Sequence, residues 1–366
     1  MSKCTVEVHL ERDDPAFTPG EPIRGTVQVT AGEPCDVRKL VLGLEWRTHG
    51  KGNTDRGRPE EVVLATDLSL IPGAPQTFSF EFEAPEGPFT YRGSIINLDW
   101  YVRANADLAW TRDPGAEAEI ILRPAPSDGA AEPVDTPLRP VRIADLPTGV
   151  IDKLQAVEAP QRWLIPKGVK TVKLSTPGGC ALLGCVLVFL VLPLLMVGGL
   201  LLAAFAEVAP KGVVQAVVLV IAGTIGFFVF RNRLAAKRLG DTELKLGSQT
   251  VRRGATLDWF LECEPPRPVT LRSVVATFTR TELATSGSGT RRTTHRKVVE
   301  EREMRLDDVA LQGGEAVVFP GRFAIGHDTP LSFGYNSNQV LWELKVDVDL
   351  PNWPDWTRKV PVEVVP

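Results

Sequence analysis

Apolar and polar residues alternate with a period of two in several short segments of the first 124 residues. The alternation is clearest in residues 6–10, 40–46 and 78–82, and turns rich in proline and glycine separate these segments. Such alternation is typical of strands that place one face in a core and the other in water. No segment of this region keeps a helical period. The pattern therefore predicts an antiparallel β-sandwich over residues 1–124.

The same pattern recurs in the last part of the chain, at a constant offset. A shift of 242 residues aligns 88–124 with 330–366 and pairs Trp100 with Trp342. An offset that stays constant over thirty-seven residues indicates a repeated unit rather than a chance likeness. The chain is therefore predicted to contain a second copy of the sandwich over residues 242–366.

Near the start of each copy the offset is smaller. There a shift of 234 residues pairs Gly20 with Gly254. The difference of eight residues must be inserted between these points in the second copy. The sequence predicts that it lengthens the polar loop 49–60 into its counterpart 285–297.

Two runs without a charged residue, 181–206 and 213–230, lie between the copies. As helices they would extend about 39 Å and about 27 Å, against a bilayer core of about 30 Å. The alternative is a helical hairpin buried in a protein core. Charge-free runs of this length favour the membrane, so a two-helix transmembrane hairpin is predicted over residues 180–230.

Basic residues flank the predicted hairpin on both sides, whereas its turn carries only Lys211. The flanking residues are Arg162, Lys167, Lys170, Lys173, Arg231, Arg233, Lys237 and Arg238. Because positive charge is enriched on the cytoplasmic side, both sandwiches are expected in the cytoplasm, at an inner or plasma membrane crossed twice. A Pro-rich linker and juxtamembrane segment would occupy residues 125–179, and a basic juxtamembrane segment residues 231–241.

Charge and cysteine content narrow the classes of function. The net charge is −4, and the one basic excess lies in residues 125–240, beside the predicted spans. Neither sandwich is basic overall, which argues against nucleic acid as a partner. The five cysteines are odd in number and scattered, so they predict neither a disulfide framework nor a metal site.

No catalytic motif stands out. The four histidines show no metal-ligand spacing, and the stretch TSGSGT lacks the lysine of a phosphate-binding loop. Neither G-x-S-x-G nor H-E-x-x-H occurs. The expectation is a protein without enzymatic activity, cofactor or metal. An active site assembled from distant residues is the alternative.

The two corresponding polar loops are the candidate contact sites. The candidate residues are Lys51, Arg56 and Arg58 in the first loop and Arg291, Arg292, Arg296 and Lys297 in the second. The first loop also carries Asp55 and Glu60, whereas the second has no acid. One interpretation is two solvated hairpin tips. The other is contact with lipid phosphates or an acidic partner, because guanidinium groups bind such oxygens in pairs.

Three stretches carry a resemblance to a known fold. They are FTPGEPIRGTVQV (17–29), APEGPFTYRGSIINLDWYVRANADL (84–108) and TPLSFGYNSNQVLWELKVDVDL (329–350). Each is similar to strand-and-turn motifs of the arrestin fold, which also includes the arrestin-fold retromer subunit and bacterial sporulation-control proteins. The resemblance implies adapter or scaffold work without catalysis.

The predicted fold is mainly β, with two tandem immunoglobulin-like (arrestin-type) β-sandwiches separated by a two-helix transmembrane hairpin. The predicted function is that of a membrane-anchored, non-catalytic scaffold or adapter for protein partners, with the bilayer and its anionic headgroups as further partners. Two alternatives stay open. One is an enzyme or enzyme subunit whose site the sequence does not reveal, and the other is a structural membrane or envelope-stress component.

Overall fold

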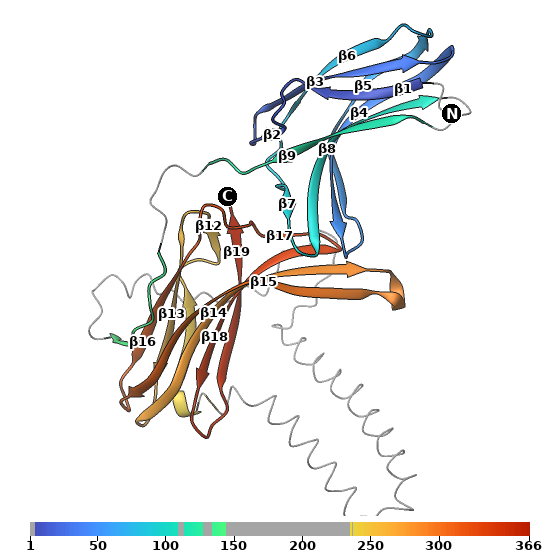
Figure 1. The fold of residues 1–366 in the computed structure, drawn as a ribbon. Coiled ribbons are helices and arrows are strands. Elements are labelled where there is room, and N and C mark those ends of the chain that lie inside the picture. Colours follow the sequence, from blue (N-terminus) through green and yellow to red (C-terminus); the bar gives the residue numbers. More distant parts are fainter. Residues whose placement is uncertain (1–3, 109–112, 127–133, 144–234, 236) are drawn as a thin grey trace, which may run out of the picture.

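A computed structural model of the chain describes residues 4–108, 113–126, 134–143, 235 and 237–366. Strands dominate this part of the chain (Figure 1). Among the described residues, helix occurs only in short elements such as the 3-10 helix η4 (Gly289–Arg291). The mainly β character predicted from the alternation is therefore what the structure shows.

The predicted transmembrane hairpin is corrected. Within the described residues, no helix is long and apolar enough to cross a membrane. Both predicted spans, 181–206 and 213–230, lie outside those residues. The structure therefore does not support the fold class with a two-helix hairpin. It also does not support the bilayer and its headgroups as partners, or the multi-pass membrane localisation. A charge-free run shows only that burial of its side chains away from water is favourable. It does not specify whether lipid or other protein residues surround them.

The first half of the chain forms two sheets. The smaller has the order β1 (Cys4–Leu10), β3 (Pro22–Ala31), β6 (Gln76–Glu83). The larger has the order β2 (Ala16–Phe17), β9 (Gly115–Leu122), β8 (Ile96–Leu108), β4 (Cys35–Gly50), β5 (Arg56–Leu70), with β7 (Tyr91–Arg92) on β8. Their inward-facing side chains share one core. This core is what the period-two alternation predicts.

The second half repeats this plan. The smaller sheet has the order β10 (Val141–Arg142), β16 (Val317–Ala324), β13 (Thr256–Glu264), β11 (Asp241–Leu246). The larger has the order β12 (Thr250–Arg252), β19 (Trp356–Val365), β18 (Asn338–Asp349), β14 (Val269–Ser286), β15 (Thr293–Leu311), with β17 (Phe333–Gly334) on β18. A second core lies between these two sheets.

Part of the predicted linker belongs to this second sandwich. Strand β10 pairs with β16, and Leu138 is buried in the second core. The carboxylate of Asp135 accepts a hydrogen bond from the Ala324 N–H. Proline and small polar residues indicated an extended segment, but the composition could not show that the segment extends along a sheet edge.

Corresponding interactions recur in the two halves. The indole N–H of Trp100 donates to the Pro88 carbonyl at 2.6 Å, and Trp342 donates to Pro330 at 3.0 Å. Both indoles are fully buried. Each tryptophan therefore holds a proline turn against the end of its own sandwich, at the offset of 242 residues.

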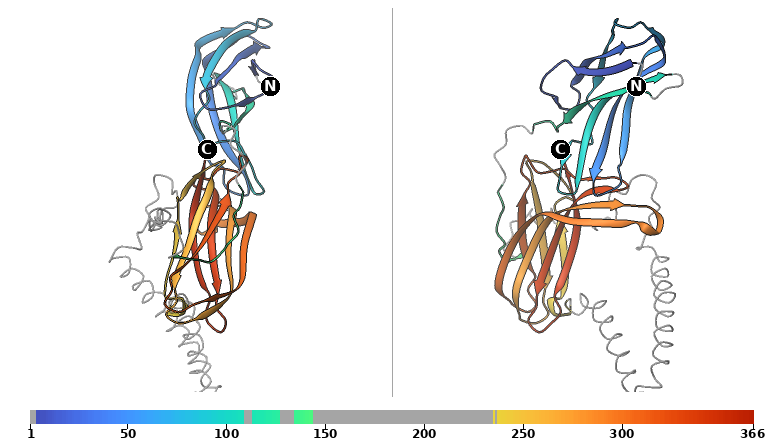
Figure 2. Two further views of the ribbon diagram at one scale, coloured as in Figure 1. Left: turned by 90° about the vertical axis from the view of Figure 1, so that its left-hand side faces the viewer. Right: turned by 45° about the vertical axis from the view of Figure 1, so that its right-hand side comes forward.

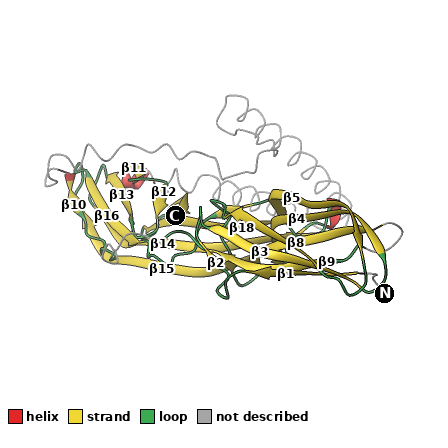
Figure 3. Ribbon diagram, turned by 90° about the horizontal axis from the view of Figure 1, so that it is seen from above, coloured by secondary structure: helices red, strands yellow, loops and turns green. Residues whose placement is uncertain are grey.

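The extra residues of the second copy mainly lengthen a hairpin rather than its loop. Strand β14 has 18 residues against 16 in β4, and β15 has 19 against 15 in β5. The longer β14–β15 hairpin extends below the tips of β4 and β8 (Figures 1 and 2). Ala284 near its end is buried in the core of the first sandwich. The two sandwiches thus lie end to end in an elongated molecule (Figure 3).

Candidate functional site

The junction between the two sandwiches brings together segments that are far apart in the chain. The turns after β4 and β7, in the first sandwich, meet the end of β14 and the turn between β17 and β18 in the second. The predicted basic loops lie at this junction. The contacts at the junction therefore determine which charged side chains of those loops are free to bind a partner.

A buried carboxylate occupies one side of the junction. Glu282 of β14 is fully buried, and it accepts hydrogen bonds from the Tyr91 hydroxyl at 2.7 Å and the Ile95 N–H at 2.7 Å. The Ser94 N–H donates to both of its oxygens, at 3.0 and 3.1 Å. Arg280 donates to the Tyr91 oxygen at 3.0 Å. Donors from the first sandwich thus compensate a charge that would otherwise be costly to bury.

Tyr91 acts in this network as a neutral hydrogen-bond donor. Its burial, and then its hydrogen bond to Glu282, raise the pKa of the hydroxyl well above its usual value. Gly93 is required beside it, because a side chain at that position would collide with the Glu282 carboxylate. The turn after β7 therefore fits the carboxylate closely.

A second polar cluster lies on the other side of the junction. The amide nitrogen of Asn338 donates to the Asp55 carboxylate at 2.8 Å, to the Thr48 hydroxyl at 2.8 Å and to the Asn53 carbonyl at 2.7 Å. Asp55 also accepts from the Ser337 N–H. Asn338 and Asp55 are both buried. These hydrogen bonds join the two sandwiches, although Asn338 Oδ1 has no hydrogen-bond partner among the described residues.

Aromatic contacts complete the junction. Trp46 packs on Tyr335 with ring centroids 4.4 Å apart, and Tyr91 packs edge-on against Phe333 at 5.4 Å. Val340 of the second sandwich is fully buried in the first core. The contact therefore has the character of a protein interior, with apolar packing around polar groups that hydrogen-bond across the junction.

The two predicted basic loops touch each other. The side-chain amide of Asn53 donates to the Gly287 carbonyl at 2.9 Å and accepts from the Gly287 N–H at 3.1 Å. The Asn53 N–H donates to the Thr285 carbonyl at 2.8 Å. These three bonds join the tip of β4–β5 to the tip of β14–β15. The loops form one surface although 234 residues separate Asn53 from Gly287.

Six of the seven candidate residues lie in or beside these tips: three in the turns and three in the adjoining ends of β5 and β15. They are exposed, and none makes an ion pair with another described residue: Lys51, Arg56, Arg291, Arg292, Arg296 and Lys297. We call these six residues the basic tips. Asp55, an acid of the first loop, is buried and faces inward to Asn338. The Asp55 carboxylate is therefore hydrogen-bonded within the junction and forms no ion pair with a cation of the tips.

Arg58 is engaged elsewhere. Its guanidinium pairs with Glu45 at 2.9 Å and with Glu61 at 2.5 Å along β4 and β5. These hydrogen bonds, the one to Glu45 first, raise the pKa of Arg58 above its usual value. Arg58 therefore belongs to a paired surface of the first sandwich rather than to the basic tips.

Metal-binding clusters are absent from the residues that the structure describes. Among the histidines, His49 contacts Asp99 through Nδ1 at 2.9 Å and His9 contacts Glu7 at 3.3 Å. Asp99 is also paired with Arg92, and neither histidine belongs to a group of three candidate metal ligands among the described residues.

Sequence reasoning missed the residues that build the junction, namely Glu282, Asn338 and the inward role of Asp55. A single glutamate at an inward position of a strand was the available signal, because β14 is otherwise apolar or neutral on its buried face. The alternation of apolar and polar residues along a strand does not predict which end of the strand contacts a second domain. The signal could be recognised only once the partner was known.

A family model described as Spo0M, SpoOM protein, matches residues 2–130. Among solved structures, the chain is similar to Spo0M, a sporulation control protein from Bacillus subtilis, with 23% sequence identity and a TM-score of 0.29. That similarity covers 33% of this chain, and the chain spans about half (50%) of the Bacillus protein. No curated protein matches the chain. The family match supports the arrestin-like fold for the first sandwich, in agreement with the resemblance of its strand-and-turn motifs.

Proposed function

We propose that this protein is a non-catalytic adapter or regulatory scaffold that binds an acidic segment of a protein partner at the basic tips. The observation that carries the proposal is the pairing of Asn53 with Gly287, which joins the two basic loops into one surface. The match to a family of sporulation-control proteins supports a regulatory rather than a catalytic role.

The charge of the surface favours an acidic peptide over other occupants. Six exposed cations lie in or beside the tips of the two hairpins, and none of them forms an ion pair with another described residue. Four of them are arginines, whose planar groups bind carboxylates through two parallel hydrogen bonds. A partner with several closely spaced carboxylates would engage the tips without entering a deep pocket.

We also propose that the chain divides into the units that the repeat suggests. The sandwiches would be residues 1–124 and 242–366, and the segments 125–179, 180–230 and 231–241 would connect them. Two separate cores support this division. The contacts of residues 134–143 with β16 suggest that part of the connection folds with the second sandwich.

Binding of a labelled acidic peptide tests the proposal. The probe is a fluorescent decapeptide of alternating glutamate and serine, and its counterpart carries glutamine in place of glutamate. Fluorescence anisotropy with the full chain should show binding of the acidic probe only. The affinity should fall as salt rises from 0.1 M to 1 M, because the screening length shortens from about 10 Å to about 3 Å.

Two matched variants locate the site. In the test variant glutamine replaces the six residues of the basic tips. In the control variant it replaces six exposed basic residues elsewhere, Lys39, Arg123, Arg139, Arg252, Arg267 and Arg358. Both variants lose the same charge. We expect at least tenfold weaker binding by the test variant than by the control. Equal affinity of the two variants would show that only net charge matters, and the proposal would then be wrong.

A further inference from the structure

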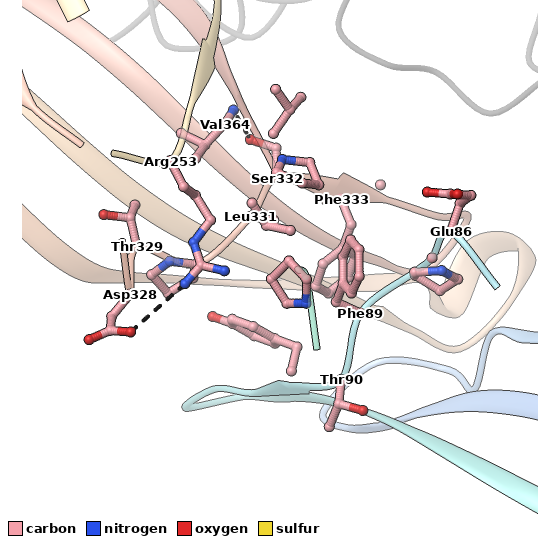
Figure 4. A pocket seen from close by; sticks show the side chains of 18 of the residues that line it. Glu86, Phe89, Thr90, Arg253, Asp328, Thr329, Leu331, Ser332, Phe333 and Val364 are labelled. Atoms are coloured by element: carbon pink, nitrogen blue, oxygen red, sulfur yellow. Dashed lines mark hydrogen bonds and ion pairs between the residues drawn. The ribbon is translucent and has the colours of Figure 1, made fainter. Parts of the chain in front are cut away.

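A pocket of about 500 Å³ opens beside the junction, away from the basic tips (Figure 4). Its walls are the two proline turns, 86–92 of the first sandwich and 328–335 of the second, with the ends of β9 and β19. The volume lies in the range of small-molecule sites, about 300–1,000 Å³. Both sandwiches contribute to it, so it exists only in the assembled chain.

The walls are held in place by hydrogen bonds that do not involve the open space. The Thr90 hydroxyl accepts from the Leu122 N–H, and the Ser332 hydroxyl accepts from the Val364 N–H, each at 2.9 Å. The indole N–H of the buried Trp342 donates a hydrogen bond to the Pro330 carbonyl and so holds this turn in place. The pocket is therefore formed before any ligand arrives, which lowers the cost of binding.

Most of the lining is apolar. Phe89, Leu331 and Phe333 border the space, and the ring of Tyr91 adds an apolar face because its hydroxyl is engaged by Glu282. Figure 4 shows Phe89 and Phe333 on the side of the pocket opposite to Arg253. Such a surface favours an aliphatic or aromatic group.

One cation in this lining lacks adequate compensation. The side chain of Arg253 is 18% exposed, and no acceptor among the described residues reaches its buried Nε. Its nearest acid is Asp328 at 3.9 Å, a side chain fully open to water. Burial of the guanidinium lowers the pKa of Arg253. The other arginine in the lining, Arg92, is already paired with Asp99 and Glu119.

Arg253 is not part of the plan that the two sandwiches share. The offset of 234 residues places Pro19 at the corresponding position of the first copy. The backbone of Arg253 needs no special side chain, since its N–H simply donates to the Val365 carbonyl at 3.0 Å. The fold therefore does not explain why a guanidinium points into an apolar pocket.

We propose that the pocket binds a small monocarboxylate with an apolar body. The carboxylate would accept hydrogen bonds from the terminal nitrogens of the Arg253 guanidinium, and the apolar body would lie against Phe89 and Phe333. Guanidinium and carboxylate match in geometry and charge. One uncompensated cation, with Glu86 and Asp328 among the lining residues, suits a single negative charge and disfavours a phosphate dianion.

Calorimetry with the full chain tests this site. The probes are 3-phenylpropionate and isovalerate, and the uncharged controls are the corresponding amides. We expect the native chain to bind at least one acid at least tenfold more tightly than its amide. This comparison needs no variant, so it does not depend on whether a substitution folds. If neither acid binds at millimolar concentration, or if acids and amides bind equally, the proposal is overturned.

Variants then assign the contact to its residue. Arg253→Gln should remove the preference for acid over amide, and Arg253→Lys should retain part of it. Arg252→Gln, a change of the same charge at the exposed neighbouring residue, should leave binding unchanged. The thermal midpoint of each variant reports whether it folds. Unchanged binding by a folded Arg253→Gln would refute the assignment. The acidic decapeptide should bind this variant as it binds the native chain, so failure at the pocket and failure at the basic tips are distinguishable.

Discussion

Replacing Glu282 by alanine tests whether the junction stabilises the molecule. The substitution leaves the buried Tyr91 hydroxyl and the buried Ile95 N–H without their acceptor. Each buried donor left unsatisfied costs about 1–3 kcal/mol, which gives about 2–6 kcal/mol for the pair. Relief from burying the carboxylate offsets part of this loss. We therefore expect the free energy of the first unfolding transition to fall by about 2–4 kcal/mol.

Guanidinium denaturation of the full chain, followed by tryptophan fluorescence, measures this change. A double-mutant cycle with Tyr91→Phe isolates the hydrogen bond between the two sandwiches, and we expect a coupling energy of about 1.5–3 kcal/mol because one partner is charged. Glu301→Ala removes an exposed carboxylate from the neighbouring strand β15. This control should change stability by less than about 0.5 kcal/mol.

Two outcomes would refute the reasoning. A loss below 1 kcal/mol for Glu282→Ala would mean that water or movement of the turn replaces the lost acceptor. A coupling energy near zero would mean that Tyr91 and Glu282 stabilise their own sandwiches independently. Either result would leave the apolar contacts, such as Trp46 with Tyr335, to hold the junction.

Three further predictions follow from burial. Trp100→Ala and Trp342→Ala should each lower the free energy of unfolding by about 3–5 kcal/mol, because both rings are fully buried; a loss below 1 kcal/mol in denaturant titrations would contradict this. Burial raises the pKa of Tyr335 to about 12, so the stability it contributes is complete below pH 10, the unfolded value, and declines as pH rises toward 12. Thermal midpoints of the native chain should therefore fall more steeply from pH 9 to pH 11 than those of Tyr335→Phe, and parallel curves would oppose the prediction. Burial likewise raises the pKa of the Cys263 thiol to about 12, so peptide mapping after alkylation at pH 8 should find Cys263 modified far more slowly than the partly exposed Cys35; equal rates would speak against this.

The period-two alternation was enough to predict strands, and the constant offset was enough to predict that corresponding elements recur. The inward positions of β18, for example, alternate with outward ones over the whole strand. Local patterns of this kind survive in the sequence because each residue of a strand faces either a core or water. The basic loops were also recognisable, since exposed cations leave a compositional trace.

The hydrophobic runs were less informative than they looked. A stretch without charged residues indicates that apolar surroundings are favourable for it. It predicted membrane helices, but no described helix is long and apolar enough to cross a membrane. The eight inserted residues were similarly misplaced. The sequence favoured a longer loop, whereas the structure adds most of them to β14 and β15, because residues such as Thr281 and Thr285 are polar yet buried within the longer hairpin.

The sequence by itself determined the strands, the repetition and the positive charge of the two tips. Only the tertiary structure decided that the tips touch through Asn53 and Gly287, that Glu282 is buried between the sandwiches and that Arg253 borders an apolar pocket. The physical reason is that these features depend on contacts between residues up to 290 positions apart, as between Thr48 and Asn338. A hydrogen bond across a junction leaves no period in either strand, so it becomes visible only when both partners are in place.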